Sequence, residues 1–340
     1  MRAYGVTYDT GFLSEGSSTH PTFDEARVYK EMEIIRQDLH CTAVRVTGGE
    51  PVRLEIAAQA AAAAGLEVWF SPFTNDLDQE ELLDFLADCA ERAERLRVAG
   101  AEVVMVTGAE LMLFTRGFLP GETLTDRLAA LSEPTVRNDT FAKLPSLLNG
   151  FLARAVDVVR ARFRGRVTYA ALPTEPVNWE PFDCIAVDAY NSAEVAHHYA
   201  DAIKKLASSN KPVVISEFGC TTFKGAFELG ARGMFIVEWD GARAVGLTDN
   251  YERDESEQVR YFEESVNIFE KAGVDAAFWC TFAAHNLPYS EDPHQDYDRA
   301  SYGVVRVLLE GNGTTYSDMP WEPKKVFSTI ATRYAAFMEP

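Results

Sequence analysis

Short runs of continuous apolar residues recur eight times along the chain, and most are followed by a segment with apolar positions at helical spacing. The runs are rich in Val, Ile, Phe, Tyr and Ala, and they lack the alternation of a strand with one face in water. Such runs are typical of parallel strands that are buried on both faces. We therefore predict eight strands, at Arg2–Tyr8, Thr42–Thr47, Glu67–Phe73, Glu102–Thr107, Arg166–Leu172, Cys184–Tyr190, Pro212–Ser216 and Ala276–Phe282.

Amphipathic segments between these runs predict helices. Thr22 is a candidate N-cap for the first of them. Gly65, Gly100, Gly165 and Gly273 each follow a helical segment, where a left-handed glycine commonly ends a helix. The predicted helices are Phe23–Leu39, Pro51–Ala64, Gln79–Arg97, Phe141–Phe163, Ser192–Ser208, Glu255–Lys271 and Pro320–Phe337.

Eight strands that alternate with helices predict an α/β fold, a single (β/α)8 or TIM barrel that spans residues 1–340 as one domain. An open doubly wound sheet is disfavoured, because no GxGxxG turn follows the first strand. Two long loops are expected, from Leu111 to about Thr140 after strand four and from Cys220 to about Asp254 after strand seven. Such loops usually lie at the catalytic face of a barrel and shape its pocket.

Charge and cysteine content restrict the partners and the compartment. The 32 Lys and Arg residues face 52 Asp and Glu residues, giving a formal net charge of −20, which predicts no nucleic-acid and no membrane partner. The start of the chain lacks a signal-peptide pattern, and no apolar run is long enough to span a bilayer. The five scattered cysteines form no CxxC pair, so we expect free thiols and a cytoplasmic location. We make no prediction of the oligomeric state.

Charged side chains follow or interrupt several buried strands. Glu217 comes directly after Val-Val-Ile-Ser, Glu110 follows strand four after two small residues, and Arg45 lies within strand two. A charge in such a place is costly unless it is paired or functional. The active site of a (β/α)8 barrel lies at the carboxyl ends of its strands. Two carboxylates with an arginine nearby suit acid/base and nucleophilic chemistry, because the arginine keeps one carboxylate ionised while a drier pocket raises the pKa of the other.

Structural roles remain open for the same side chains. Glu217 can serve as a helix N-terminal acid or pair a structural arginine, Glu110 can brace the long loop, and Arg45 can form a salt bridge that fills the barrel. Tyr190 and Trp279 can be core aromatics. The six histidines do not cluster at strand ends, so no metal is predicted, and without a phosphate-binding glycine run no other cofactor is predicted either.

The segment Pro212–Gly219, with the sequence PVVISEFG, resembles the strand-seven nucleophile motif of the clan of (β/α)8 retaining glycoside hydrolases with catalytic glutamates on strands four and seven. Supporting pieces are AVRV at 43–46, FDCIAVDAY at 182–190, and Phe278-Trp279, where the clan usually has a strand-eight tryptophan. Together these pieces span nearly the whole chain in the expected order. One departure is Ala109, which stands where the clan typically has an asparagine that binds the sugar 2-hydroxyl.

A second resemblance concerns residues 217–239 together with Ala300–Val304. These segments resemble uncharacterised bacterial proteins labelled as abortive phage infection proteins. That label implies no mechanism.

The resemblance to the hydrolase clan implies the retaining hydrolysis of an O-glycoside, with a carbohydrate or glycoside as the partner. Glu217 would be the nucleophile and Glu110 the general acid/base, with carboxyl groups about 5–5.5 Å apart. Arg45 would keep Glu217 ionised, and Tyr190 would donate a hydrogen bond to it. The remaining candidates are aromatic faces for sugar stacking, namely Trp279, Trp179 and Phe73, and hydroxyl partners, namely Asp9, Asn75, Glu175 and Asp188.

Two alternatives stand beside this hypothesis. The chain can be a catalytically silent barrel that binds a carbohydrate or a protein, with Glu110 in a structural role, which the Ala109 departure favours. It can also be a transglycosidase that acts on a small glycoside with the same residues. The position of the two carboxylates distinguishes these hypotheses. An enzyme requires both of them to face one cleft, whereas a silent barrel does not.

Overall fold

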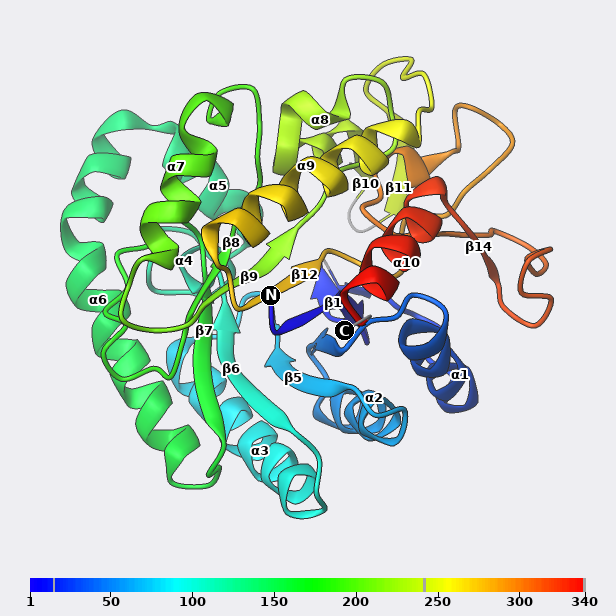
Figure 1. The fold of residues 1–340 in the computed structure, drawn as a ribbon. Coiled ribbons are helices and arrows are strands. Elements are labelled where there is room, and N and C mark those ends of the chain that lie inside the picture. Colours follow the sequence, from blue (N-terminus) through cyan, green and yellow to red (C-terminus); the bar gives the residue numbers. More distant parts are fainter. Residues whose placement is uncertain (15, 241–242, 339–340) are drawn as a thin grey trace.

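Eight parallel strands form a closed barrel in the computed structural model, which describes residues 1–340 apart from 15, 241–242 and 339–340 (Figure 1). The order around the barrel is β1-β12-β9-β8-β7-β6-β5-β4, and β4 pairs with β1 to close it. All eight predicted strands are confirmed, and with them the (β/α)8 fold. Their bounds are β1 Ala3–Asp9, β4 Ala43–Gly48, β5 Glu67–Pro72, β6 Val103–Ala109, β7 Arg166–Ala171, β8 Ile185–Asp188, β9 Val213–Phe218 and β12 Ala276–Trp279.

The predicted helices are present on the outside of the barrel, with ends that differ by a few residues. The longest, after β6, begins seven residues earlier than predicted, and the last begins five residues later than predicted because residues 321–323 form a strand. Their bounds are α1 Glu25–Gln37, α2 Pro51–Ala63, α3 Gln79–Val98, α6 Pro134–Arg160, α7 Ala196–Ala207, α9 Ser256–Ala272 and α10 Lys325–Met338. No helix occurs in residues 172–184, all of them described, so the chain returns from β7 to β8 as an irregular segment.

Two details of the helix ends differ from the prediction. The N-cap of α1 is Asp24 rather than Thr22, because the Asp24 carboxylate accepts the Arg27 N–H at 3.1 Å. Gly65, Gly100 and Gly273 are left-handed as predicted, whereas Gly165 has no positive φ. A Cβ at Gly165 would lie 2.3 Å from the Phe163 ring, so close packing rather than backbone conformation explains a glycine there.

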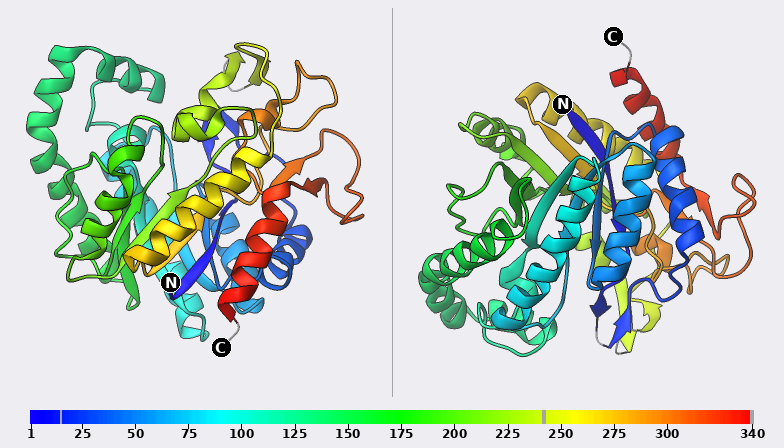
Figure 2. Two further views of the ribbon diagram at one scale, coloured as in Figure 1. Left: turned by 45° about the horizontal axis from the view of Figure 1, so that its top comes forward. Right: turned by 90° about the horizontal axis from the view of Figure 1, so that it is seen from below.

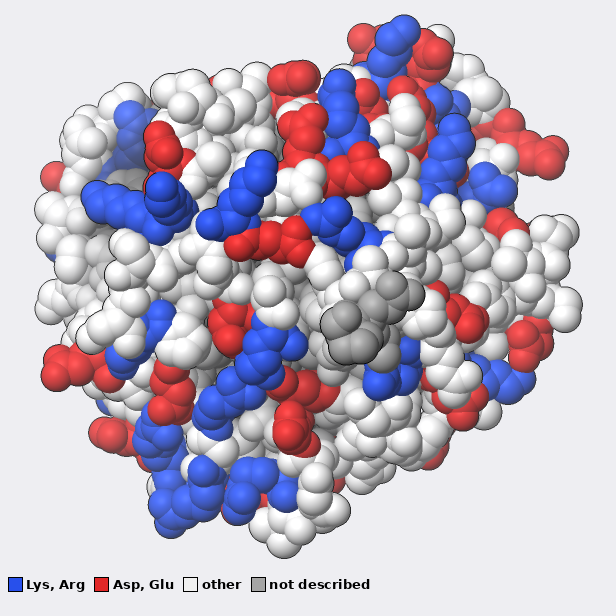
Figure 3. Space-filling model, viewed as in Figure 1, with Lys and Arg blue, Asp and Glu red and all other residues white. Residues whose placement is uncertain are grey.

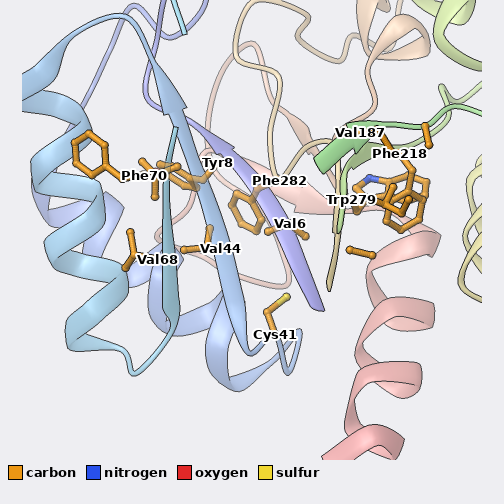
Figure 4. Packing of buried hydrophobic residues seen from close by; sticks show 14 of the residues in the cluster. Val6, Tyr8, Cys41, Val44, Val68, Phe70, Val187, Phe218, Trp279 and Phe282 are labelled. Carbon is orange, nitrogen blue, oxygen red and sulfur yellow. The ribbon is translucent and has the colours of Figure 1, made fainter. Parts of the chain in front are cut away.

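The core has two layers. Inside the barrel, small side chains such as Ala43, Ala170 and Ala186 surround Trp69 and Phe278, whose rings are 5.1 Å apart. The larger cluster lies between the strands and the helices, and Figure 4 shows part of it. Along most of the strands the two layers alternate with period two, as expected of parallel strands buried on both faces, and irregularities in β6 and β9 interrupt this alternation near the carboxyl end.

Additional elements follow the carboxyl ends of four strands. After β1 come β2 Leu13–Ser14 and β3 Ser17–Ser18, and after β6 come α4 Leu111–Phe114 and α5 Leu124–Ser132. After β9 come α8 Ala226–Leu229, the 3-10 helix η1 Gly230–Ile236, and the hairpin β10 Val237–Asp240 with β11 Arg243–Leu247. After β12 come η2 Tyr297–Ala300, β13 Val305–Val307 and β14 Trp321–Pro323. Figures 1 and 2 show α8, β10 and β11 grouped beside one end of α9.

The two predicted insertions are therefore partly regular structure. The segment from Leu111 to Thr140 is mostly helical, and within Cys220–Asp254 residues 241–242 lie outside the described part. The segment after β12 is a third long insertion, which the sequence did not lead us to expect.

The surface charges and the cysteines have no special arrangement in the described structure. Figure 3 shows basic and acidic side chains interspersed on one face, so the acidic excess forms no single patch there. All five cysteines, each of which lies in a described segment, are free. Among the helices the structure describes, none is long and apolar enough to cross a membrane.

Candidate active site

Side chains at inward positions of the strands converge at the carboxyl end of the barrel. On β4, Ala43 faces the interior, and two residues later Arg45 is fully buried. On β8, Cys184 and Ala186 face inward, so the same period places Asp188 and Tyr190 at the mouth. Simple alternation along β4 and β8 therefore directs the side chains of Arg45, Asp188 and Tyr190 toward the mouth of the barrel.

Glu217 and Glu110 depend on irregular backbone instead. In β9 the outward residues are Ile215 and Phe218, three positions apart, and the pairing with β8 shifts before Glu217. In β6 the pairing with β7 shifts between Val106 and Ala109, where Gly108 has φ +129°. Such bulges re-aim side chains near active sites.

Arg45 holds Glu217 through a charged hydrogen bond. Its Nη1 donates to Glu217 Oε1 at 2.7 Å and to the Ser216 carbonyl at 3.1 Å, while its Nε donates to the Ser71 hydroxyl at 3.1 Å. The Tyr190 hydroxyl donates to Glu217 Oε2 at 3.1 Å. Both Glu217 oxygens thus accept hydrogen bonds, one of them from a cation, and these contacts fix the position of the carboxyl group.

Glu110 is held in a left-handed conformation, with φ 47° and ψ 40°. The next two amides are fixed by neighbouring side chains: Leu111 N–H donates to the Tyr169 hydroxyl at 2.8 Å, and Met112 N–H donates to Glu175 at 3.0 Å. Burial raises the pKa of Glu110 well above its usual value, and the nearby charges of Asp188 and Glu217 raise it further. Burial and the neighbouring negative charges therefore favour the protonated form of Glu110.

A third carboxyl group completes the cluster. Oxygens of Glu110, Asp188 and Glu217 all lie within 4.8 Å of one another. Asp188 is 1% exposed, and its Oδ1 lies 3.8 Å from Arg45 Nη1. Burial and the Glu217 charge raise the pKa of Asp188 to about 8. The mouth thus contains one carboxylate paired with an arginine and two carboxyl groups that favour the protonated form.

This cluster is also the arrangement through which the site could hold a divalent cation, because three carboxylate oxygens suit a hard metal ion. Arg45, however, already places a positive charge 2.7 Å from Glu217. A cation between the carboxylates would therefore be repelled by that guanidinium. The donors present serve a metal less well than they serve acid/base chemistry.

Four other predicted site residues lie near this mouth, and each contacts other parts of the protein. Phe73, partly buried, packs against Phe12 and Phe114 and against the inner cluster. Asn75 Nδ2 donates to the Leu13 carbonyl at 3.1 Å. Asp9 accepts hydrogen bonds from the Gly11 amide and the Thr19 hydroxyl. Glu175 accepts hydrogen bonds from the Tyr169 hydroxyl and from the amides of Met112 and Leu172. Both carboxyl groups therefore already have hydrogen-bond partners within the protein.

Two predicted stacking residues lie elsewhere. Trp279 is fully buried on the outer side of β12, against Phe218 and Phe262, and its indole N–H donates to the Tyr302 carbonyl at 2.8 Å (Figure 4). Phe278 takes the inward position, so the expectation that Trp279 offers a face for sugar stacking is wrong, because the two residues are one step apart on a strand whose side chains alternate.

Trp179 lies near the opposite end of the barrel. Its carbonyl accepts a hydrogen bond from Lys211, which precedes the first residue of β9, and its ring packs on Phe182, which precedes β8. The expectation that Trp179 stacks on substrate is therefore wrong. The irregular segment between β7 and β8 has already descended to the amino ends of the strands at this point.

Several side chains at the mouth were missed by the sequence interpretation. Ser71 holds Arg45, and the partly exposed Cys280 lies beside the Tyr190 and Thr7 hydroxyls. Tyr302 packs 5.9 Å from the Tyr190 ring and donates to the Ala231 carbonyl at 2.6 Å. Ser71, Thr7 and Cys280 stand at even spacing from inward-facing residues of β5, β1 and β12. Continuing the two-residue alternation to the end of each strand would therefore have predicted that they face the mouth.

The fold and site define a (β/α)8 barrel with a carboxylate cluster at its mouth, and solved structures of this shape exist. A GH113 β-1,4-mannanase matches with a TM-score of 0.62 and 16% identity over 99% of this chain and 100% of its own. The endo-1,4-β-D-mannanase of Thermotoga petrophila matches with a TM-score of 0.52 and 12% identity over 99% of this chain and 100% of its own. The β-glucuronidase of Parabacteroides merdae matches with a TM-score of 0.60 and 12% identity over 98% of this chain but only 36% of its own.

At these identities the likeness shows the fold alone. No protein-family profile matches the sequence. No curated protein matches it either.

Proposed function

We propose that the protein is a retaining glycoside hydrolase in which Glu217 is the nucleophile and Glu110 the general acid/base. The observation that carries the proposal is that two carboxyl groups with different surroundings lie side by side at the mouth of the barrel. Glu217 is bound to Arg45 and Tyr190, whereas burial and neighbouring carboxylates raise the pKa of Glu110 well above its usual value. Their oxygens lie within 4.8 Å, in keeping with the short carboxyl separation of retaining enzymes.

The first step forms a covalent intermediate. A Glu217 oxygen attacks the anomeric carbon, the bond from that carbon to the leaving oxygen breaks, and Glu110 gives its proton to that oxygen. Arg45 and Tyr190 position the attacking carboxylate. They also stabilise the negative charge that returns to the Glu217 carboxylate when the intermediate is later cleaved.

The second step reverses these roles. Glu110, now ionised, takes a proton from water while the water oxygen attacks the anomeric carbon, and the bond to Glu217 breaks. The product keeps the anomeric configuration of the substrate. Both steps use protein side chains and water.

Chromogenic aryl glycosides of different sugars and both anomers test this proposal. Wild type should hydrolyse at least one of them, and Glu217→Gln should lose that activity by a factor on the order of 10³ or more. Hydrolysis should survive exhaustive chelation, because Glu217 and Glu110 perform the chemistry. Tyr199→Phe, which removes a buried hydroxyl bonded to the Ala189 carbonyl outside the cluster, is a matched control for loss of one buried polar group.

Activity that persists undiminished in Glu217→Gln would contradict the proposal. So would activity that chelation abolishes and a divalent ion restores. Binding of a sugar without turnover of any aryl glycoside would favour the catalytically silent barrel.

A further inference from the structure

The Tyr190 side chain lies between Glu217 and a second tyrosine. Tyr190 follows the last residue of β8 by two positions, and its hydroxyl donates to Glu217 Oε2 at 3.1 Å. Arg45 holds the other oxygen, Oε1, at 2.7 Å. The orientation of the Glu217 carboxyl group therefore depends on where the Tyr190 ring lies.

The backbone and the ring of Tyr190 are held in different ways. The backbone beside it is fixed, because the Ala189 N–H donates to the Glu217 carbonyl at 2.8 Å. The ring lies beyond the end of the strand and packs against Tyr302, with the ring centres 5.9 Å apart and the planes tilted by 56°. Separations of this size are typical of favourable aromatic pairs. The contact with Tyr302 therefore restricts rotation of the Tyr190 ring.

Tyr302 is itself anchored at both ends. Its carbonyl accepts the Trp279 indole N–H at 2.8 Å, and its hydroxyl donates to the Ala231 carbonyl at 2.6 Å. Its ring also lies against the end of β9, since a Cβ at Gly219, two residues after Glu217, would be 3.5 Å from a Tyr302 ring carbon. Tyr302 belongs to the insertion after β12 and Ala231 to the insertion after β9, so this side chain joins the two insertions beside Glu217.

We propose that Tyr302 is a positioning residue that acts through Tyr190, holding the Tyr190 ring so that its hydroxyl reaches Glu217 Oε2. The inference rests on the proposed function for the role of Glu217 as the nucleophile. Without the Tyr302 ring, Tyr190 is free to turn away, and Oε2 of Glu217 loses its donor. A nucleophile that is slightly misplaced loses rate more than it loses substrate binding, so kcat should fall while KM changes little.

A double-mutant cycle separates this action from a general loss of packing. Tyr190→Phe removes the hydroxyl that Glu217 accepts, Tyr302→Leu removes the supporting ring, and a third variant combines the two. Tyr302→Phe keeps the ring and loses the bond to Ala231. We would measure kcat and KM on an aryl glycoside that wild type hydrolyses, and the unfolding midpoint of every variant.

Tyr316→Leu is the matched control. Tyr316 is a partly buried tyrosine of the same insertion, its ring packs on Trp321, and its hydroxyl donates to Asp38 at 2.6 Å. The control therefore loses a comparable ring and hydroxyl that have no contact with Tyr190.

The effects on kcat should not add. Tyr190→Phe should lower kcat by roughly 10- to 100-fold, as loss of a hydrogen bond to a charged group does. Tyr302→Leu should lower kcat by roughly 10-fold and Tyr302→Phe by less, because the Phe ring still supports Tyr190. In the Tyr190→Phe background neither substitution should lower kcat further. Tyr316→Leu should leave kcat unchanged in both backgrounds.

The position of the Tyr190 ring can also be measured without turnover. In protein isotope-labelled at the tyrosine ring carbon that bears the hydroxyl, the NMR signal missing from Tyr190→Phe identifies Tyr190. Glu217→Gln should move this signal, because it removes the charge that accepts the hydrogen bond. In Tyr302→Leu the same substitution should move the signal far less, and in Tyr316→Leu it should move the signal as in wild type.

Each outcome separates this inference from the hydrolase proposal. A Tyr190 signal that responds to Glu217→Gln only while Tyr302 is present, without hydrolysis of any glycoside, would support the positioning role while the proposed function fails. Additive losses of kcat, or a response that Tyr302→Leu leaves intact, would overturn the inference and leave the hydrolase standing. A rise in KM that persists in the Tyr190→Phe background would overturn it too, because Tyr302 would then contact the substrate. If Tyr302→Leu does not fold, the same cycles with Tyr302→Phe decide between these outcomes.

Discussion

Glu110 and Glu217 are the same residue type in one pocket, and their neighbours separate them. Glu217 accepts hydrogen bonds from Arg45 and Tyr190 on its two carboxyl oxygens. Burial raises the pKa of Glu110, and the nearby charges of Asp188 and Glu217 raise it further. Division of the chemistry between them is therefore a property of the surroundings, and it can be tested one residue at a time.

Glu110→Ala should lose activity in a way that depends on the leaving group. A poor leaving group needs protonation, so its hydrolysis should fall by a factor on the order of 10² or more, whereas an activated aryl group should keep its first step. Azide should then accelerate turnover, because it replaces the water that Glu110 would activate. Steady-state rates for a series of aryl glycosides, with and without azide, measure both effects. An equal small loss for all leaving groups without an azide effect would make Glu110 structural.

The pH profile should show the raised pKa of Glu110. The first step with a poor leaving group requires the protonated form, so kcat/KM should fall as pH rises through that pKa. Asp188→Asn removes a like charge that raises the pKa of Glu110, so the alkaline limb should move to lower pH by about one unit or more. Profiles of both proteins on a neutral glycoside provide the measurement. A limb that moves to higher pH would contradict this electrostatic account.

At the scale of elements, the junction between β6 and α4 places Glu110. Tyr169 on β7 accepts the Leu111 N–H and donates to Glu175, whose carboxylate also accepts the Met112 and Leu172 N–H groups. Strand β7 and the short helix α4 thus share one buried acceptor, the Glu175 carboxylate. We therefore assign Glu175 a positioning role for Glu110 rather than contact with substrate.

Glu175→Gln should change the pH dependence of stability. Burial raises the pKa of Glu175 from 4.5 to about 7, so its contribution to folding is fully present below pH 4.5 and is lost as pH rises to about 7. This window corresponds to about 3 kcal/mol of unfolding free energy, which the glutamine variant should not show. Denaturant unfolding at several pH values measures the slope. Glu180→Gln, an exposed neighbour on the same segment, is the control, and a slope that persists in Glu175→Gln would refute the assignment.

At the scale of the molecule, buried ion pairs join the insertions after β9 and β12 to the last helix. Lys324, fully buried before α10, donates to Asp298 at 3.0 Å, and Asp298 accepts from Arg253 at 2.7 Å. Arg253 also pairs with Asp296, which accepts from Arg299. Segments that are distant in the sequence are therefore fixed around the same end of the barrel.

Lys324→Met should destabilise the fold by about 3–5 kcal/mol, because it removes one partner of a buried pair. Lys30→Met removes an exposed pair with Asp318 and should cost at most about 1 kcal/mol. Unfolding midpoints of the two variants make a matched comparison. Equal small losses in both would show that the buried network contributes little.

The sequence by itself determined the barrel, because eight apolar runs with helices between them leave few other ways to bury both faces of each strand. It also singled out Arg45, Tyr190 and Glu217, since each stands at an inward position or directly after a buried strand, where a polar group must have a reason. The role of these residues in chemistry stays a prediction for experiment.

Only the tertiary structure decided which strand-end residues meet. Trp279 and Phe278 are adjacent in the sequence, and strand parity alone turns the tryptophan outward and the phenylalanine inward. Trp179 follows β7, yet the irregular return places it at the far end of the barrel. Asp188 gains its importance from the distances to Glu110 and Glu217. Local sequence sets which residues are buried, but bulges, irregular connections and the charges brought in by other strands set what each buried group can do.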